Sequence, residues 1–159
     1  MGVGKSSVAR NVAHLLGLKR VDLDLVLEES EGRKVAEIID AEGETAFREI
    51  ETDILARVLA MPGVSILSLG GGTWTLERNR KLIRDAGFTS VWLEATFEHC
   101  WLNIAFSRKD RPLARNKEHA IRLFEERQKH YSLADWHFVV QPGLTSYDVA
   151  KQIVEEVFS

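Results

Sequence analysis

The chain has 159 residues, a length that suits one domain with a substantial hydrophobic core. Its net charge of −3, with acidic and basic residues mixed throughout, argues against a nucleic-acid-binding or polybasic membrane-binding protein. No apolar run approaches the roughly 20 residues that span a bilayer, and the one cysteine, Cys100, forms no internal disulfide, so we expect a cytoplasmic protein.

The first seven residues, MGVGKSS, match the second half of a phosphate-binding loop, whose full pattern is G-x-x-x-x-G-K-S/T. Backbone N–H groups at the start of a helix over 6–16 are expected to bind phosphate, because the helix dipole favours anions there. The residues expected to bind ATP are Gly2, Val3, Gly4, Lys5, Ser6 and Ser7. Lys5 would reach the β- and γ-phosphates, and the Ser6 hydroxyl would ligate Mg²⁺. The alternative is a flexible tail capped by Ser6.

Strands alternate with helices along the rest of the chain. The predicted strands are 19–23, 64–69, 89–93 and 136–140, and the predicted helices are 6–16, 33–41, 44–60, 76–86, 97–106, 117–132 and 146–158. This alternation predicts an α/β fold in which helices flank a parallel sheet. We see no repeat or linker, so 1–159 is expected to be a single domain.

Two aspartates follow the first predicted strand at the edge where parallel sheets bind ligands. Phosphoryl transfer needs two carboxylates in different roles, one on the metal and one on the acceptor hydroxyl. Asp22 and Asp24 can supply them. The alternative for either residue is a helix cap in a turn at the end of the strand.

Arg48 and Glu51 lie three residues apart on the predicted helix 44–60, outside its apolar stripe. Glu51 can fix the Arg48 guanidinium for a bidentate grip on a carboxylate. The alternative is an ion pair that faces solvent and contributes about 0.3–0.5 kcal/mol.

Three glycines, Gly70, Gly71 and Gly72, follow a buried strand and offer bare backbone to a small polar ligand. A flexible loop is the alternative. The basic segment 107–116 is expected to form a mobile lid from which Arg111 would reach a triphosphate, and the alternative is a charged surface loop. Arg127, on the predicted helix 117–132, is unremarkable by itself.

Taken in order, these motifs resemble the shikimate kinase family. They are G-x-G-K-S at the start, D-L-D at 22–24, G-E-x-x-F-R-x-x-E at 43–51, G-G-G at 70–72, R-P-L at 111–113 and R-x-x-x-Y-x-x-A at 127–134. The resemblance spans nearly the whole chain. It implies ATP-dependent phosphorylation of the 3-hydroxyl of shikimate, on the route to chorismate and the aromatic amino acids.

The resemblance also implies a role for each matched residue. Lys5 and Ser6 would serve the phosphates and Mg²⁺, with Asp22 assisting the metal. Asp24 would bind the reacting hydroxyl as the candidate base, and Arg111 would come from the lid onto ATP. Arg48 and Arg127 would clamp the carboxylate of shikimate, while Gly70, Gly71 and Gly72 shape its pocket. The substrate-binding helices would span about 25–60, and the protein is expected to be a monomer.

The implied architecture is the three-layer P-loop kinase fold, from which this chain departs. The lid carries Ala114 where a second leucine is usual. The first, central strand of the sheet, expected between 64–69 and 89–93, is missing together with the first glycine of the phosphate loop, and we interpret Met1 as an internal methionine of a longer protein. Two alternatives are another small-molecule kinase, such as a gluconate kinase, and a catalytically impaired nucleotide-binding relative.

Overall fold

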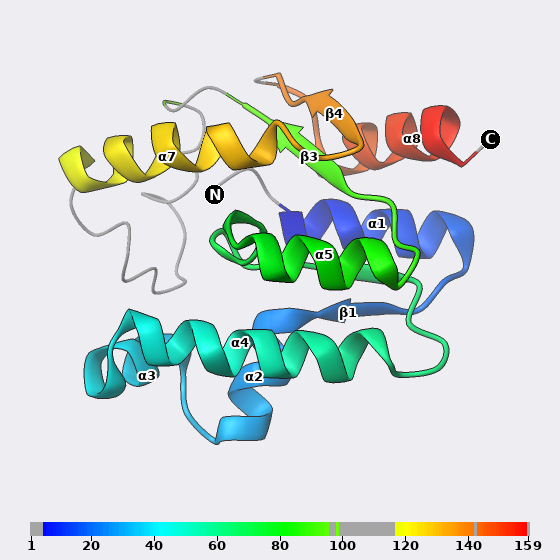
Figure 1. Ribbon diagram of the computed structural model, residues 1–159. Helices are drawn as coiled ribbons and strands as arrows, with labels where there is room; N and C mark the ends of the chain where they lie inside the picture. The colour runs from blue at the N-terminus through cyan, green and yellow to red at the C-terminus, as the bar shows by residue number, and fades with distance from the viewer. Residues whose placement is uncertain (1–4, 96–97, 99–116, 142, 159) are drawn as a thin grey trace.

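The computed structural model describes residues 5–95, 98, 117–141 and 143–158 (Figure 1). The elements in chain order are α1 (Lys5–Leu16), β1 (Arg20–Asp22), α2 (Leu23–Glu31), α3 (Val35–Glu42), α4 (Glu44–Leu59), β2 (Ile66–Ser68), the 3₁₀ helix η1 (Thr73–Thr75), α5 (Glu77–Asp85), β3 (Val91–Glu94), α7 (Lys117–Tyr131), β4 (Trp136–Val139) and α8 (Ser146–Val157). The predicted helix 97–106, Cys100 and the predicted lid 107–116 fall outside these ranges, apart from residue 98. Among the described helices, none combines the length and apolar character that crossing a membrane requires.

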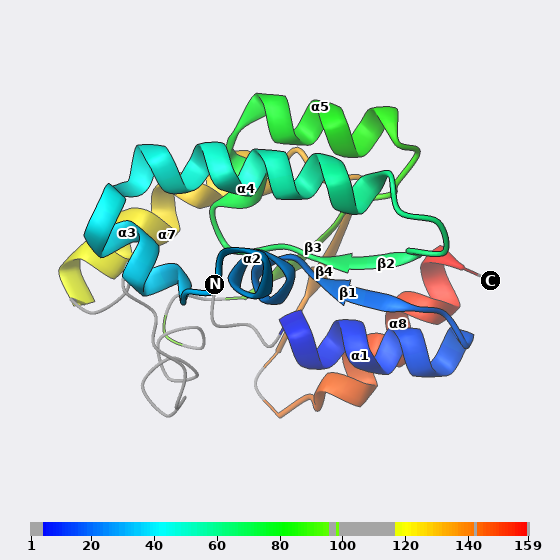
Figure 2. The same ribbon diagram turned by 90° about the horizontal axis from the view of Figure 1, so that it is seen from below.

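The strands form the middle of three layers (Figure 2). Helices α4 and α5 cover one side of the strands, and α1 and α8 cover the other. Each side has its own apolar core: Phe47, Ile54 and Leu55 belong to the core beneath α4, whereas Val12 and Ile153 belong to the core between α1 and α8. The predicted α/β fold with helices on both faces is confirmed.

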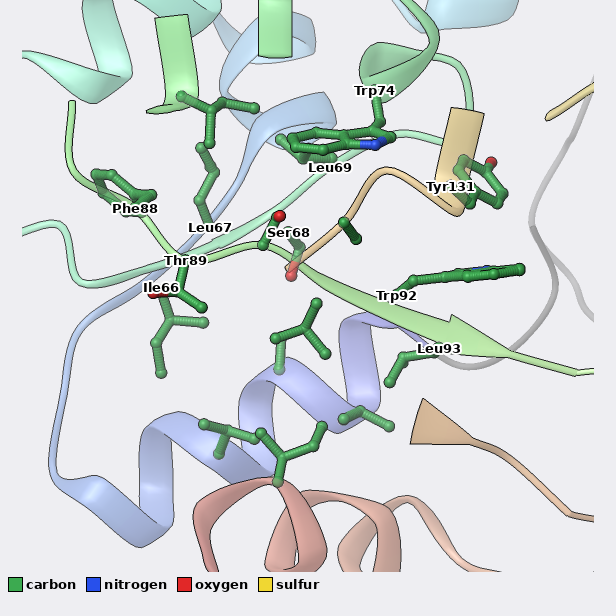
Figure 3. A pocket seen from close by; sticks show the side chains of 18 of the residues that line it. Ile66, Leu67, Ser68, Leu69, Trp74, Phe88, Thr89, Trp92, Leu93 and Tyr131 are labelled. Atoms are coloured by element: carbon green, nitrogen blue, oxygen red, sulfur yellow. The ribbon is translucent and has the colours of Figure 1, made fainter. Parts of the chain in front are cut away.

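All the observed strand pairs are parallel, as predicted. Strand β1 pairs with β2 in a register that aligns Val21 with Leu67, and β3 pairs with β4 in a register that aligns Leu93 with Phe138. Within the described residues β2 and β3 do not pair, so the strands form two separate two-stranded sheets. An apolar cavity of about 230 Å³ lies between these strands, lined from β2 by residues including Leu67 and from β3 by Trp92 and Leu93 (Figure 3). The family resemblance implies a central strand at this position, between 64–69 and 89–93.

Helix α2 was absent from the helices predicted from the residue pattern, although the resemblance placed substrate-binding helices over about 25–60. The predicted strand 19–23 instead ends at Asp22, because the Asp22 carboxylate oxygen Oδ1 accepts the backbone N–H groups of Asp24 at 3.0 Å and Leu25 at 3.3 Å. These bonds satisfy two of the N–H groups that have no partner within the first turn of a helix. Helix α2 ends at Gly32, whose φ of 67° lies in the left-handed region that glycine adopts without strain. The short connection from β1 therefore delivers Asp24 at the start of a helix.

Candidate active site

The three glycines that follow β2 each lie against one of the side chains that the sequence analysis assigned to the acceptor substrate. A Cβ atom at Gly70 would approach Asp24, one at Gly71 would approach Arg127, and one at Gly72 would approach Arg48. Asp24 comes from α2, Arg48 from α4 and Arg127 from α7. Residues that are as much as 103 positions apart in the sequence therefore converge on one stretch of bare backbone.

Asp24 lies in the first turn of α2, directly after the Asp22 cap. A Cβ atom at residue 70 would lie 3.0 Å from one Asp24 carboxylate oxygen and 3.2 Å from the other. The carboxylate is half-buried and faces the glycine backbone across this contact. A half-buried carboxylate beside open backbone can accept a proton from a hydroxyl that is bound there.

The Arg48 guanidinium is held on several sides. Its Nη1 donates to Glu51 Oε1 at 2.8 Å, and its Nη2 donates to Glu44 Oε1 at 3.4 Å. The guanidinium carbon lies 5.0 Å from the centre of the Phe47 ring. The side chain of Arg48 is 13% exposed and that of Glu51 is 1% exposed, so the pair is buried and the solvent-facing alternative is wrong.

Arg127 is buried on α7, with 8% of its surface exposed. Desolvation lowers the pKa of Arg127, and the positive charge of Arg48 lowers it further, while Tyr131 and Glu44 oppose the shift. The structure thus places two guanidinium groups close enough to repel each other in a site shielded from water. No ion pair joins Arg127 to a carboxylate among the described residues. An anionic ligand between the two arginines would offset both the repulsion and the burial cost.

The glycine loop is attached to α7 by two hydrogen bonds that the sequence analysis did not foresee. The hydroxyl of Tyr131 donates to the carbonyl of Gly71, and the indole Nε1 of Trp74 donates to the carbonyl of His130 at 3.0 Å. Tyr131 had appeared only as a motif position. Trp74 carried no signal, because a tryptophan after a glycine run reads as an ordinary core residue.

Asp22 serves as the N-cap of α2, which is the alternative that the sequence analysis left open for it. The described residues contain no group of three or more histidine, cysteine or acidic side chains that could hold a metal ion without another ligand. Mg²⁺ is commonly bound by one or two protein side chains together with substrate phosphates. The assignment of Ser6 and Asp22 to Mg²⁺ therefore stays a prediction.

The ATP side of the site is described in part. Helix α1 begins at Lys5, at the same edge of the molecule at which β1 ends (Figures 1 and 2). Ser7 lies half-buried in the first turn of this helix. Gly2, Val3, Gly4 and Arg111, as well as the side chains of Lys5 and Ser6, lie outside the described part of the chain. Their roles stay predictions.

Comparison with known proteins agrees with this geometry. The family model for shikimate kinase matches residues 1–158. A shikimate kinase of Caulobacter vibrioides is 40% identical over 158 residues, which cover 97% of this chain and 76% of the relative. A shikimate kinase of Persephonella marina is 32% identical over 162 residues, which cover 99% of this chain and 94% of the relative.

Solved structures agree as well. Shikimate kinase from Acinetobacter baumannii in complex with shikimate superposes with a TM-score of 0.88 at 28% identity, covering 99% of this chain and 88% of that one. Shikimate kinase from Aquifex aeolicus superposes with a TM-score of 0.80 at 31% identity, covering 98% of this chain and 90% of that one. The family match extends over nearly the whole chain, and Asp24, Arg48 and Arg127 meet at one glycine loop in the structure. The chain belongs to the shikimate kinase family.

Proposed function

We propose that this chain transfers the γ-phosphoryl group of ATP to the 3-hydroxyl of shikimate. The observation that carries the proposal is the convergence of Asp24, Arg48 and Arg127 on the three consecutive glycines. Two arginines and a carboxylate around bare backbone suit an acceptor that has a carboxylate at one end and hydroxyls at the other.

In this proposal Arg48 and Arg127 bind the carboxylate of shikimate. A guanidinium offers parallel N–H donors that match the two oxygens of a carboxylate. Glu51 occupies Nη1 of Arg48, so the geometry of the guanidinium is fixed before the ligand arrives. Bound substrate would place one negative charge between two buried positive groups, which favours shikimate over acceptors that lack a carboxylate.

Asp24 is proposed to orient the acceptor hydroxyl and to accept its proton as the new P–O bond forms. Its position in the first turn of α2 brings the half-buried carboxylate against Gly70, the first of the three glycines. A general base of this kind contributes about 10²- to 10⁴-fold to the rate. Gly70, Gly71 and Gly72 would shape the floor of the acceptor pocket.

For the nucleotide, the N-terminus of α1 has the right chemistry. The unpaired N–H groups at the start of a helix bind phosphate, and the Gly4-Lys5-Ser6 sequence supplies the side chains that accompany such loops. Mg²⁺, when bound with ATP, neutralises the charge that develops on the phosphates. Ser6 and Asp22 are proposed to hold it, and Lys5 and Arg111 to bind the transferring phosphoryl group. We also propose that the chain is one domain and acts as a cytoplasmic monomer.

The purified 159-residue chain, incubated with ATP and Mg²⁺, tests the proposal against its alternatives. We expect ADP release to depend on shikimate, and proton and phosphorus NMR to identify shikimate 3-phosphate as the product. Comparable turnover of gluconate would favour another small-molecule kinase. Nucleotide binding without turnover of either substrate would favour an impaired relative, and either result would reject the proposed activity.

A further inference from the structure

Behind Arg48 lies a ring of hydrogen-bonding contacts that returns to the same residue. It leaves Arg48 through the guanidinium and comes back through the Arg48 backbone carbonyl. Its members come from α4, from η1 and from α5, and in order they are Arg48, Glu51, Thr73, Asn79 and Thr52. Thr73, Asn79 and Thr52 played no part in the sequence analysis.

The first half of the ring fixes the Glu51 carboxylate. Its Oε1 accepts from Arg48 Nη1 at 2.8 Å, and its Oε2 accepts from the hydroxyl of Thr73 at 2.9 Å. Glu51 is 1% exposed and Thr73 is fully buried, so water cannot replace either bond. Removing the hydroxyl would leave one buried carboxylate oxygen without its donor, and Glu51 would gain freedom to rotate.

The second half of the ring holds Thr73 in place. Asn79, which is also fully buried, donates from Nδ2 to the carbonyl of Thr73 at 3.0 Å. A carbonyl can only accept, so this bond fixes the orientation of the amide and directs Oδ1 at Thr52. The Thr52 hydroxyl lies 2.8 Å from Oδ1 of Asn79 and 3.0 Å from the backbone carbonyl of Arg48, and its one proton is shared between these two acceptors.

The position of Thr73 connects this ring to the acceptor pocket. Its backbone N–H donates to the carbonyl of Gly70 at 3.2 Å, so the residue closes the turn that the three glycines begin. The next residue, Trp74, bonds to α7 through its indole, and α7 carries Arg127. One short segment therefore sets the position of Arg48 relative to both the glycine backbone and Arg127.

We propose that Thr73 and Asn79 are positioning residues that orient the Arg48 guanidinium, through Glu51, for recognition of the acceptor carboxylate. They act without touching substrate. The expected change in the KM for shikimate rests on the proposed function. The expected change in the orientation of Arg48 does not. Losing the Thr73 hydroxyl should therefore weaken binding of the acceptor and leave binding of the nucleotide unchanged.

The test compares Thr73→Val, which keeps the shape of the side chain and removes the hydroxyl, with Thr73→Ser, which keeps the hydroxyl. We expect Thr73→Val to raise the KM for shikimate about tenfold while the KM for ATP stays within twofold, and Thr73→Ser to restore most of the affinity. A second variant, Thr52→Val, breaks the ring at a half-buried position, and we expect it to raise the KM for shikimate about threefold. Unchanged KM for shikimate in both valine variants would overturn the proposal.

Two controls separate positioning from a general loss of stability. Ile153→Val removes a methylene group from the core beneath α8 and touches no member of the ring, so it should lower the melting temperature without changing the KM for shikimate. Thr89→Val repeats the chemical change at an exposed position. If Ile153→Val raised the KM for shikimate as much as Thr73→Val does, the effect would be one of stability and the proposal would fail.

A readout without substrate distinguishes this proposal from the proposed function. In ¹⁵N NMR spectra of the ligand-free protein, the Nη signals of Arg48 should be resolved, because its bond to Glu51 slows rotation of the guanidinium. We expect them to merge in Thr73→Val and to stay resolved in Thr73→Ser. Merging in a protein that does not phosphorylate shikimate would reject the proposed function but support the positioning role. Resolved signals in Thr73→Val would reject the positioning role whatever the activity.

Discussion

The backbone of Gly72 lies directly against the guanidinium of Arg48. A Cβ atom at residue 72 would lie 2.6 Å from the guanidinium carbon, nearer than real side chains approach one another. The φ of Gly72 is −100°, a value that any residue adopts. Glycine is therefore required here by the space that Arg48 occupies and not by the conformation of the backbone.

Gly72→Ala should therefore impair the pocket without straining the backbone. The new methyl group has to displace Arg48 from its position beside Glu51, and we expect the KM for shikimate to rise at least tenfold, a cost of about 1.4 kcal/mol or more. Alanine is compatible with the local backbone, so a fall in the melting temperature should come only from the loss of the bond between Arg48 and the buried Glu51 carboxylate. Steady-state kinetics and thermal denaturation of the same preparation measure both quantities.

The matched control is Gly87→Ala, which has the opposite character. Gly87 has a φ of 82°, and a Cβ atom there would meet nothing within 4 Å. Alanine at this position should cost about 1–2 kcal/mol of stability through backbone strain and leave the KM for shikimate unchanged. If Gly72→Ala binds shikimate normally, Arg48 does not contribute to the acceptor pocket in the observed conformation.

Asp24→Asn tests the proposed base. Asparagine keeps the shape and the hydrogen-bonding capacity but cannot take up a proton at neutral pH. We expect kcat to fall about 10²- to 10⁴-fold, with a much smaller change in the KM for shikimate. Full activity of this variant would remove Asp24 from the chemical step.

Asp22→Asn is the informative comparison for Asp24→Asn. Asparagine caps helices as well as aspartate does, so α2 and its first turn should be preserved. A fall in activity with a raised requirement for Mg²⁺ would support a metal role for Asp22 beyond the cap. Activity that is unchanged at every Mg²⁺ concentration would show that Asp22 caps α2 and does not bind the metal.

The fold and the Arg48–Glu51 pair were predictable because their signals are local. Strands such as Ile66–Ser68 lie within apolar runs bounded by turn residues, and Arg48 and Glu51 lie one helical turn apart. Their pairing follows from helix geometry alone, and the structure confirms it at 2.8 Å. The burial of the pair could not be read from the sequence, since it depends on η1 packing over α4.

The ring behind Arg48 was not predictable for a different reason. Thr73 and Glu51 are 22 residues apart, and Asn79 and Thr52 are 27 apart, so their contacts arise only after α4, η1 and α5 have packed. Threonine and asparagine after a glycine run read as turn residues. The residue pattern did not show where α2 begins, because Asp22 was assigned to the end of a strand and to a metal, and its capping bonds were only the alternative interpretation.

The N-cap of α8 offers a test of pH dependence. The backbone N–H of Thr145 donates to Asp148 Oδ2 at 3.0 Å, and this bond lowers the pKa of Asp148, as does the hydroxyl of Thr145. A carboxyl whose pKa is lower in the folded state stabilises the fold above its ordinary pKa, which is 3.8 here. That contribution is lost as the pH falls through the lower folded-state pKa.

Asp148→Asn should therefore be less stable than the parent chain near pH 6, and the difference should shrink as the pH is lowered below about 3.8. Melting temperatures of the two proteins from pH 6 down to pH 2.5 provide the measurement. A difference that is constant over this range would mean that the charge of Asp148 contributes nothing to the cap. Since α8 packs against α1 and away from the acceptor side chains, the KM for shikimate should not change.

Arg127→Met addresses the cost of keeping two guanidinium groups together in a buried site. Desolvation lowers the pKa of Arg127, and Arg48 adds repulsion, so the ligand-free protein holds a charge that its surroundings disfavour. Methionine fills a similar volume without charge, and Tyr131 can still donate to the carbonyl of Gly71. We expect the melting temperature without ligand to stay the same or to rise by about 2–4 °C.

Binding should show the opposite effect. Loss of one of the two guanidinium groups proposed to bind the carboxylate should raise the KM for shikimate about 100-fold and abolish the thermal stabilisation that shikimate gives the parent chain. The control is Arg33→Met, which removes the half-exposed partner of Glu42 and Glu31 and should change neither quantity appreciably. A ligand-free Arg127→Met protein that melts well below the parent would show that Arg127 stabilises the fold. Stability retained and shikimate binding lost would show that its buried charge is kept for the acceptor carboxylate.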